Sequence, residues 1–238
     1  MNTKKIIIAL LCGMLGCVLM CAGDWLMLYG DPTYNGSLYW LTDGAADIPA
    51  WRNALSMAVA FPAVVLYAFG LFVVGSFLQG EHRQRTYHFL TVFGLLPWLC
   101  LHLFIAATLY VFAWLQSSEW SDAAFPVAEA LRNQYVWIVY LSYLFMLPPY
   151  IYLAWQLLKG RSIFPRIRTL SNPLIIYLLL KVVTSLMPVS AFRIGFTNGL
   201  MSESMFLWFF TILVWTVKAM KKDKRRGKES ALGESKTC

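Results

Sequence analysis

Six long apolar stretches dominate this sequence, and few charged residues interrupt them. They cover residues 6–29, 54–78, 87–115, 135–158, 174–191 and 204–220. A hydrocarbon core roughly 30 Å thick requires about 20 mostly apolar residues per helix. Inside lipid, each backbone polar group has to be paired within its own segment or within a closed barrel, and barrel strands alternate polar and apolar residues. The uninterrupted runs therefore predict an all-α, polytopic membrane bundle of six transmembrane helices.

Composition agrees with this class, because 59% of the 238 residues are hydrophobic and 13% are charged, against about 25% in soluble domains. The segments that flank the stretches alternate in charge. Four of them are basic and carry Lys4, Lys5, Arg83, Arg85, Lys159, Arg161, Arg166, Arg168 and the lysines and arginines from Lys218 to Lys228. Cytoplasmic segments carry an excess of Lys and Arg, so both termini are predicted to be cytoplasmic and three loops to face outside.

The net charge of +8 follows from this topology and from a basic C-terminal tail, so it requires no nucleic-acid partner. Such a tail is attracted to anionic lipid headgroups, at about 1 kcal/mol for each basic residue. Its polar composition predicts disorder over residues 223–238. Residues 1–222 are predicted to form one transmembrane domain.

Ionisable residues inside the apolar stretches are the main functional candidates, since a charge at membrane depth is unfavourable and usually functional. His102 and Lys181 lie near the middle of the third and fifth stretches, and Asp24 lies near the outer end of the first. Arg193 and Glu203 add charges at the outer ends of the last two. One hypothesis is a polar cavity open to the outside, with Asp24 paired to Lys181 or Arg193 and His102 at its floor.

Each of these residues also has a simpler interpretation. His102 can be satisfied by a neighbouring hydroxyl or backbone carbonyl, and Lys181 can extend its aliphatic stem toward the headgroups. Asp24 can stabilise a helix end. As candidates for ligand binding or proton coupling, we retain Asp24, His102, Lys181, Arg193 and Glu203.

Proline, tyrosine and small residues add structural expectations. Proline falls inside four of the six stretches, at Pro62, Pro97, Pro148 with Pro149, and Pro188. Proline tends to kink a helix, and kinked bundles often enclose a cavity, although proline is also simply commoner in membrane helices. Tyr140, Tyr143 and Tyr150 lie beside Pro148, and their hydroxyls require partners in a dry environment. A row of small residues in the first stretch, Ala9, Gly13, Cys17 and Cys21, predicts close helix packing.

Motifs for common chemistries are absent from the sequence. It has no glycine-rich phosphate loop, no His-Glu-x-x-His zinc motif, no Gly-x-Ser-x-Gly nucleophile turn and no cysteine pair at zinc spacing. No metal and no cofactor are therefore predicted. An enzyme is not excluded, because His102 and Asp24 have the side chains of a general base and its orienting group.

The chain also resembles a known group of proteins. The segment GDWLMLYG at the end of the first stretch, the mid-helix His102, and the region from FPRIRTLSNPL to GLMSESMF resemble a family of uncharacterised bacterial six-helix integral membrane proteins. The resemblance covers nearly the whole chain up to the basic tail. It implies a location in the bacterial plasma membrane and no particular activity.

Together these patterns predict a multi-pass plasma-membrane protein that binds or transports a small molecule through an outward-facing polar cavity. Two alternatives from other classes remain open. One is a membrane enzyme that acts on a lipid or lipid-linked substrate, and the other is an accessory subunit whose intramembrane charges bind a partner helix. The sequence does not specify the oligomeric state.

Overall fold

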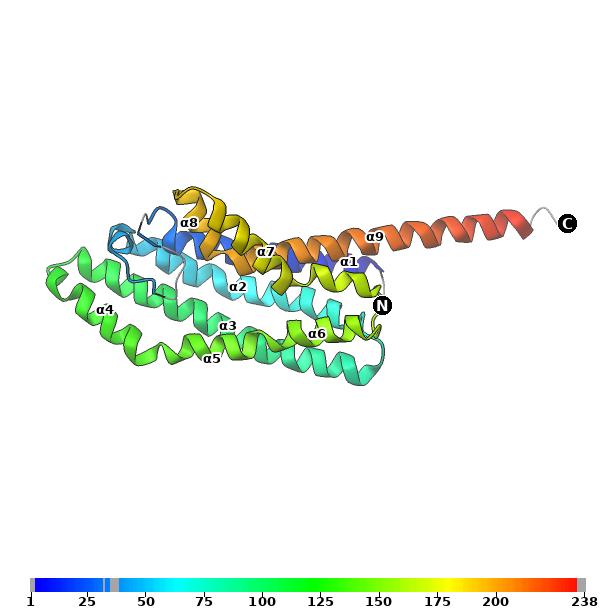
Figure 1. Ribbon diagram of the computed structural model, residues 1–238, viewed down its shortest axis with the longest axis horizontal. Coiled ribbons are helices and arrows are strands. Elements are labelled where there is room, and N and C mark those ends of the chain that lie inside the picture. The colour runs from blue at the N-terminus through cyan, green and yellow to red at the C-terminus, as the bar shows by residue number, and fades with distance from the viewer. Residues whose placement is uncertain (1–2, 32, 35–38, 235–238) are drawn as a thin grey trace.

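The computed structural model describes residues 3–31, 33–34 and 39–234, with side chains up to residue 219. Within these ranges the fold is a bundle of helices without named strands (Figure 1). Its elements are α1 (Thr3–Leu28), η1 (Asp43–Asp47), α2 (Ala50–Gly75), α3 (Glu81–Gln116), α4 (Ser121–Tyr135), α5 (Trp137–Met146), α6 (Pro148–Leu158), η2 (Arg166–Ser171), α7 (Pro173–Leu186), α8 (Ala191–Asn198) and α9 (Leu200–Glu234). The predicted all-α bundle is confirmed.

Five helical segments of the described chain are long and apolar enough to cross a membrane. They are α1, α2, α3, the α5–α6 pair over Trp137–Leu158, and Leu200–Ala219 of α9. The fifth predicted stretch forms α7, which has 14 residues and is therefore about 21 Å long, shorter than the hydrocarbon core. The class of a multi-pass membrane protein follows from these helices, whereas a count of six spans does not.

Several helix ends differ from the predicted stretches for local reasons. The fourth stretch is divided at Leu147, directly before the Pro148–Pro149 pair, into α5 and α6. The last stretch begins earlier than predicted, at Leu200, which is the first residue of α9. The short helix α8 precedes it, and Gly199 separates the two helices. Pro62 and Pro97 lie inside helices α2 and α3 that remain continuous.

The core is organised around a close contact between α1 and α2. A β-carbon added at Gly16 would lie 2.7 Å from the Ala63 carbonyl oxygen and 2.8 Å from the Tyr67 backbone nitrogen, so only glycine fits there. At Gly13 an added β-carbon would lie 3.0 Å from the α-carbon of Gly70. Glycine on two facing helices lets their backbones approach, as the small residues of the first stretch predicted.

The basic segments gather at one end of the bundle. The N-terminus, the α2–α3 turn and the connection after α6 all lie there (Figure 1, right), and the last part of α9 projects beyond them. The two connections are joined by backbone hydrogen bonds from Gln79 N to Arg161 O (2.9 Å) and from Ile163 N to Phe77 O (3.1 Å). The predicted disordered tail, residues 223–238, overlaps this projecting part of α9, which ends at Glu234. A helix that packs against nothing is only marginally stable in water, so disorder of the tail stays a prediction.

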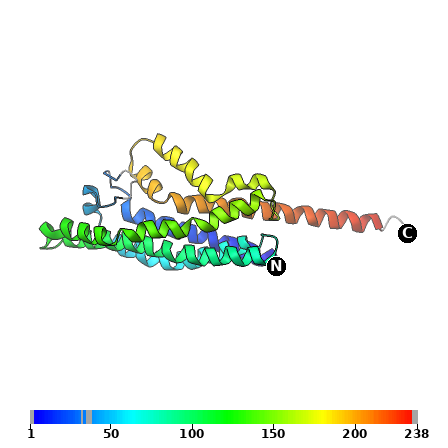
Figure 2. The same ribbon diagram turned by 60° about the horizontal axis from the view of Figure 1, so that its bottom comes forward.

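The opposite end is covered by the connection between α1 and α2. Asp31, fully buried, accepts hydrogen bonds from Thr33 N (2.8 Å), Thr33 Oγ1 (2.7 Å), Tyr34 N (3.2 Å) and the Thr42 hydroxyl. These bonds hold the described part of the connection against the bundle, and Trp40, a residue of the connection, is buried there. Figure 2 shows α7, in yellow, leaning away from the other helices toward this end.

Candidate functional site

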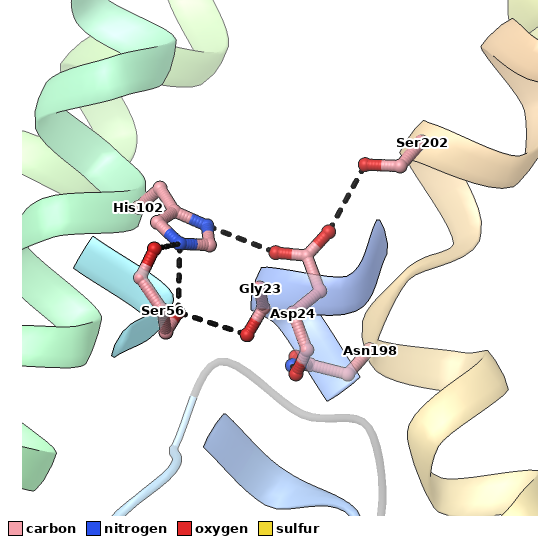
Figure 3. A network of polar contacts seen from close by, with 6 residues as sticks. All are labelled: Gly23, Asp24, Ser56, His102, Asn198 and Ser202. Atoms are coloured by element: carbon pink, nitrogen blue, oxygen red, sulfur yellow. Dashed lines mark hydrogen bonds and ion pairs between the residues drawn. The ribbon is translucent and has the colours of Figure 1, made fainter. Parts of the chain in front are cut away.

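A chain of polar contacts connects three helices near the covered end of the bundle (Figure 3). Asp24 on α1 lies with its Oδ1 3.0 Å from Nδ1 of His102 on α3. On the other side of the ring, Nε2 of His102 lies 2.9 Å from the hydroxyl oxygen of Ser56 on α2 and 3.3 Å from its backbone oxygen. The Ser56 hydroxyl in turn lies 2.8 Å from the carbonyl oxygen of Gly23. Every polar atom of the His102 ring is therefore occupied.

The donors in this chain can be assigned from the groups around them. The Gly23 carbonyl oxygen accepts and cannot donate, so the proton of the Ser56 hydroxyl points to it. The Ser56 oxygen then accepts from His102, and Nε2 carries a hydrogen. One more proton must lie between Nδ1 and the Asp24 carboxyl group, because two bare acceptors at 3.0 Å would repel each other. Wherever that proton sits, the Asp24–His102 pair has no net charge.

The second carboxylate oxygen of Asp24 faces the junction of α8 and α9. The Ser202 hydroxyl, in the first turn of α9, donates to Oδ2 of Asp24 at 3.0 Å. The side-chain amide of Asn198, the last residue of α8, donates to the backbone oxygen of Asp24. Half-helix ends of this kind commonly surround binding sites in membrane proteins, because they free polar groups at membrane depth.

Gly23 makes room for the His102 ring. A β-carbon at this position would lie 3.1 Å from Cε1 and 3.2 Å from Nε2 of the ring, which is tighter than an ordinary contact. The absence of a side chain at Gly23 thus lets the ring approach α1, where its two nitrogens meet Asp24 and Ser56.

A cavity of about 280 Å³ adjoins this chain of contacts. Asp24, His102 and Lys181 all line it. Its remaining walls come from α1, α3, α5, α7, the α8–α9 junction and the α1–α2 connection, and they combine phenol groups with apolar side chains, among them Tyr34, Tyr143, Tyr177, Trp40, Trp98 and Met146. Three candidates from distant parts of the sequence therefore share one cavity, and their role in ligand binding or proton coupling stays a prediction.

The expected pairing of Asp24 was wrong. Its carboxylate contacts His102 and Ser202, not Lys181 or Arg193. Among the described side chains, the ion pairs within 4.0 Å are His102 with Asp24 and Arg85 with Glu81, so the Lys181 ammonium lines the cavity without a carboxylate partner.

Arg193 and Glu203 lie outside this cavity. The Arg193 guanidinium donates to the Met187 backbone oxygen at 2.8 Å and so stabilises the turn between α7 and α8. Glu203 points to the other side of α1, where its Oε1 accepts from Trp25 Nε1 at 3.2 Å. There it lines an apolar groove together with Cys17 and other residues of α1 and α9.

The contacts of Ser56, His102 and Asp24 have the order found in serine hydrolases. Ser56, however, is fully buried, does not line the cavity and directs its proton to the Gly23 carbonyl oxygen. A nucleophile must reach its substrate and direct its proton to the base, so this serine is a structural partner of the imidazole.

Ser56, Asn198 and Ser202 were missed by the sequence analysis. Neutral polar residues are common in membrane helices, and no local spacing links Ser56 to His102, 46 residues away, or Asn198 and Ser202 to Asp24, 174 and 178 residues away. For the three tyrosines beside Pro148, the sequence indicated only that their hydroxyls require partners. In the structure Tyr143 lines the cavity, Tyr150 is buried in the core and Tyr140 is 60% exposed.

The fold and the site together define an all-α multi-pass membrane protein with a polar cavity inside its helical bundle. The chain belongs to a family of unknown function, DUF6796, whose model matches residues 1–219. This match confirms the resemblance to an uncharacterised family, and it establishes neither a bacterial origin nor a number of spans. No curated protein matches the chain. No solved structure matches it either.

Proposed function

We propose that this chain is a multi-pass protein of a bacterial plasma membrane that binds a small molecule carrying an anionic group, in a cavity facing the outer half of the membrane. The observation that carries the proposal is the cavity of about 280 Å³ that Asp24, His102 and Lys181 line together. Cavities of this size with a few convergent polar groups are the usual sites of small ligands.

The anionic character of the ligand follows from the charges that face the cavity. The Asp24–His102 pair is neutral as a unit, by the proton assignment above. Lys181 therefore leaves one uncompensated positive charge in the cavity, at a depth where an unpaired charge is unfavourable. A bound carboxylate or phosphate would compensate it through a charge-assisted hydrogen bond.

The orientation rests on the distribution of basic residues. The end of the bundle that holds Lys4, Lys5, Arg83, Arg85, Lys159 and Arg161 meets the cytoplasm in this proposal, and both termini lie on that side. The cavity lies toward the opposite end, beneath the connection that contains Trp40. We propose binding and not transport, because transport would require a second opening of the cavity toward the basic end.

Thiol reactivity tests the cavity without knowledge of the ligand. In a variant lacking the five native cysteines, Lys181→Cys is treated with a small neutral thiosulfonate, which reacts with ionised thiols. We expect it to react at least about tenfold faster than Leu178→Cys, since a thiol in a polar cavity ionises and a thiol in lipid does not. Leu178 lies on the same helix and is 62% exposed on the surface, which makes it the matched control. Equal rates at the two positions would contradict a polar cavity at Lys181.

A further inference from the structure

The walls of the cavity differ in their exposure, and this difference shows where the cavity opens. On the α1 and α3 side, the lining residues Met27, Trp98 and His102 are buried. On the other side, Tyr143 of α5 is 39% exposed although it lines the cavity, and Tyr177 of α7 is partly exposed. The cavity therefore opens sideways, between α5 and α7, and we refer to this opening as the mouth.

The surface around the mouth is apolar. On α5, Tyr140 is 60% and Leu144 65% exposed, and on α7, Leu178 is 62% and Val182 59% exposed. Apolar side chains with this exposure on a membrane-spanning bundle face the lipid. The mouth thus connects the cavity with the hydrocarbon region of the membrane.

The inside of the cavity is polar at the level of Lys181 and apolar further toward the basic end. α7 runs from the basic end toward the covered end, so Leu174 lies about 10 Å below Lys181 along its axis. α5 runs in the opposite direction, and Leu147, directly after it, lies about 12 Å below Val139. Leu147, Leu174 and Trp98 thus form an apolar section beneath the polar groups.

We infer that the ligand is an amphiphile with an anionic headgroup, which enters from the lipid through the mouth, places its headgroup at Lys181 and leaves its alkyl chain between Leu147 and Leu174. This inference rests on the proposed function and adds the class of the ligand and its route. A free inorganic anion would share the headgroup chemistry but would use neither the apolar section nor the mouth.

Thermal unfolding of the full chain in digitonin, followed by tryptophan fluorescence, tests the inference with three probes. Inorganic phosphate presents the headgroup alone, dodecyl phosphate presents headgroup and chain, and dodecyl maltoside presents the same chain with a neutral head. Because binding to the folded state raises the unfolding midpoint, we expect dodecyl phosphate to stabilise at a concentration at least about tenfold lower than either other probe.

Variants identify the two parts of the site. Lys181→Met is expected to raise the required dodecyl phosphate concentration about tenfold or more, while Lys181→Arg retains stabilisation and shows that the fold tolerates substitution there. Lys159→Met removes an exposed cation at the basic end and serves as the control. Leu174→Trp narrows the apolar section and is expected to weaken dodecyl phosphate about tenfold without affecting inorganic phosphate. Its control is Leu179→Trp, at a position of α7 that is 61% exposed and does not line the cavity.

The outcomes separate the inference from the proposed function. If both phosphates stabilise equally and both require Lys181, the cavity binds a free anion, so the amphiphile is refuted and the proposed function stands. Equal stabilisation by dodecyl maltoside, unchanged by Lys181→Met, would overturn anion recognition. If no probe stabilises, the inference is overturned, and the thiol reactivity of Lys181→Cys decides whether the proposed function falls with it.

Discussion

Replacing Asp24 by asparagine and by alanine distinguishes a shared proton from a fixed ion pair. In Asp24→Asn, the amide can donate to Nδ1 of a neutral His102 while its oxygen accepts from Ser202, so each hydrogen bond of the side chain is retained. The pair also stays neutral. We therefore expect a loss of about 1 kcal/mol in unfolding free energy, the scale of one altered hydrogen bond.

Asp24→Ala removes both acceptors. It leaves Nδ1 of His102, which is 3% exposed, and the hydroxyl of the fully buried Ser202 each without its hydrogen-bond partner. An unsatisfied buried donor costs about 1–3 kcal/mol, and breaking a buried pair about 3–5 kcal/mol. Breaking the pair thus costs the alanine variant about 3–5 kcal/mol, against about 1 kcal/mol for the asparagine variant, so the alanine variant should be less stable by about 2–4 kcal/mol.

The assay is equilibrium unfolding in mixed micelles of dodecyl maltoside and sodium dodecyl sulfate, followed by tryptophan fluorescence. The same two substitutions at Asp47, an exposed residue at the covered end, provide the control and should give equal, small effects. If Asp24→Asn destabilises as much as Asp24→Ala, an amide cannot replace the carboxyl group. The pair is then an ion pair with the proton on Nδ1 of His102, and the expectation that an amide retains the hydrogen bonds of Asp24 is wrong.

Four further predictions concern other parts of the chain. Nitrogen NMR of labelled His102 should show a hydrogen on Nε2, and an unprotonated Nε2 would refute the donor assignment at Ser56. Gly16→Ala should lower the unfolding free energy by about 1–3 kcal/mol, because its β-carbon would meet backbone atoms of α2, and an unchanged melting curve would contradict that packing. Asn53→Leu should raise the unfolding midpoint, since both polar atoms of this buried amide lack a protein partner, and a lower midpoint would mean that water or another group satisfies them. Cys238 should react with an impermeant thiol reagent only after cells are opened, and labelling of intact cells would reverse the proposed orientation.

The membrane bundle could be predicted because long apolar runs have few other solutions. The bounds of α1, α2 and α3 contain or closely follow the first three stretches. The fourth stretch also agrees with the span Trp137–Leu158, whereas the last two differ more from α7 and α9, whose ends depend on local polar residues. Ser202, Glu203 and Ser204 interrupt the apolar run, yet all three lie in the first turns of α9, where Ser202 bonds to Asp24 and Glu203 to Trp25.

For the site, the sequence could predict candidate residues but not the contacts between them. Asp24, His102 and Lys181 are conspicuous in the sequence because they are ionisable within apolar stretches, and all three line the cavity. The pairing of Asp24 with Lys181 or Arg193 followed from opposite charge alone and was wrong, because Asp24 instead contacts the His102 ring, whose other nitrogen bonds to Ser56. Such partnerships depend on the crossing of α1, α2 and α3, which no local pattern encodes.

The two ends of α7 are held by different contacts, a capped first turn at one end and the Arg193–Met187 hydrogen bond in the turn at the other. Asn172 accepts from Leu174 N at 3.0 Å and donates its amide to the Tyr150 oxygen of α6 at 3.0 Å, so the first turn is held, whereas Pro188 in the turn beyond the helix is exposed. Lys181 lies nine residues after Asn172, about 13 Å away along the axis of α7. A tilt of about 10° about Asn172 would displace the ammonium by about 2 Å, most of a hydrogen-bond length. A ligand bound between α5 and α7 would therefore also move the Lys181 ammonium that binds its headgroup. The affinity for the ligand would then depend on the tilt of α7 that the ligand itself causes.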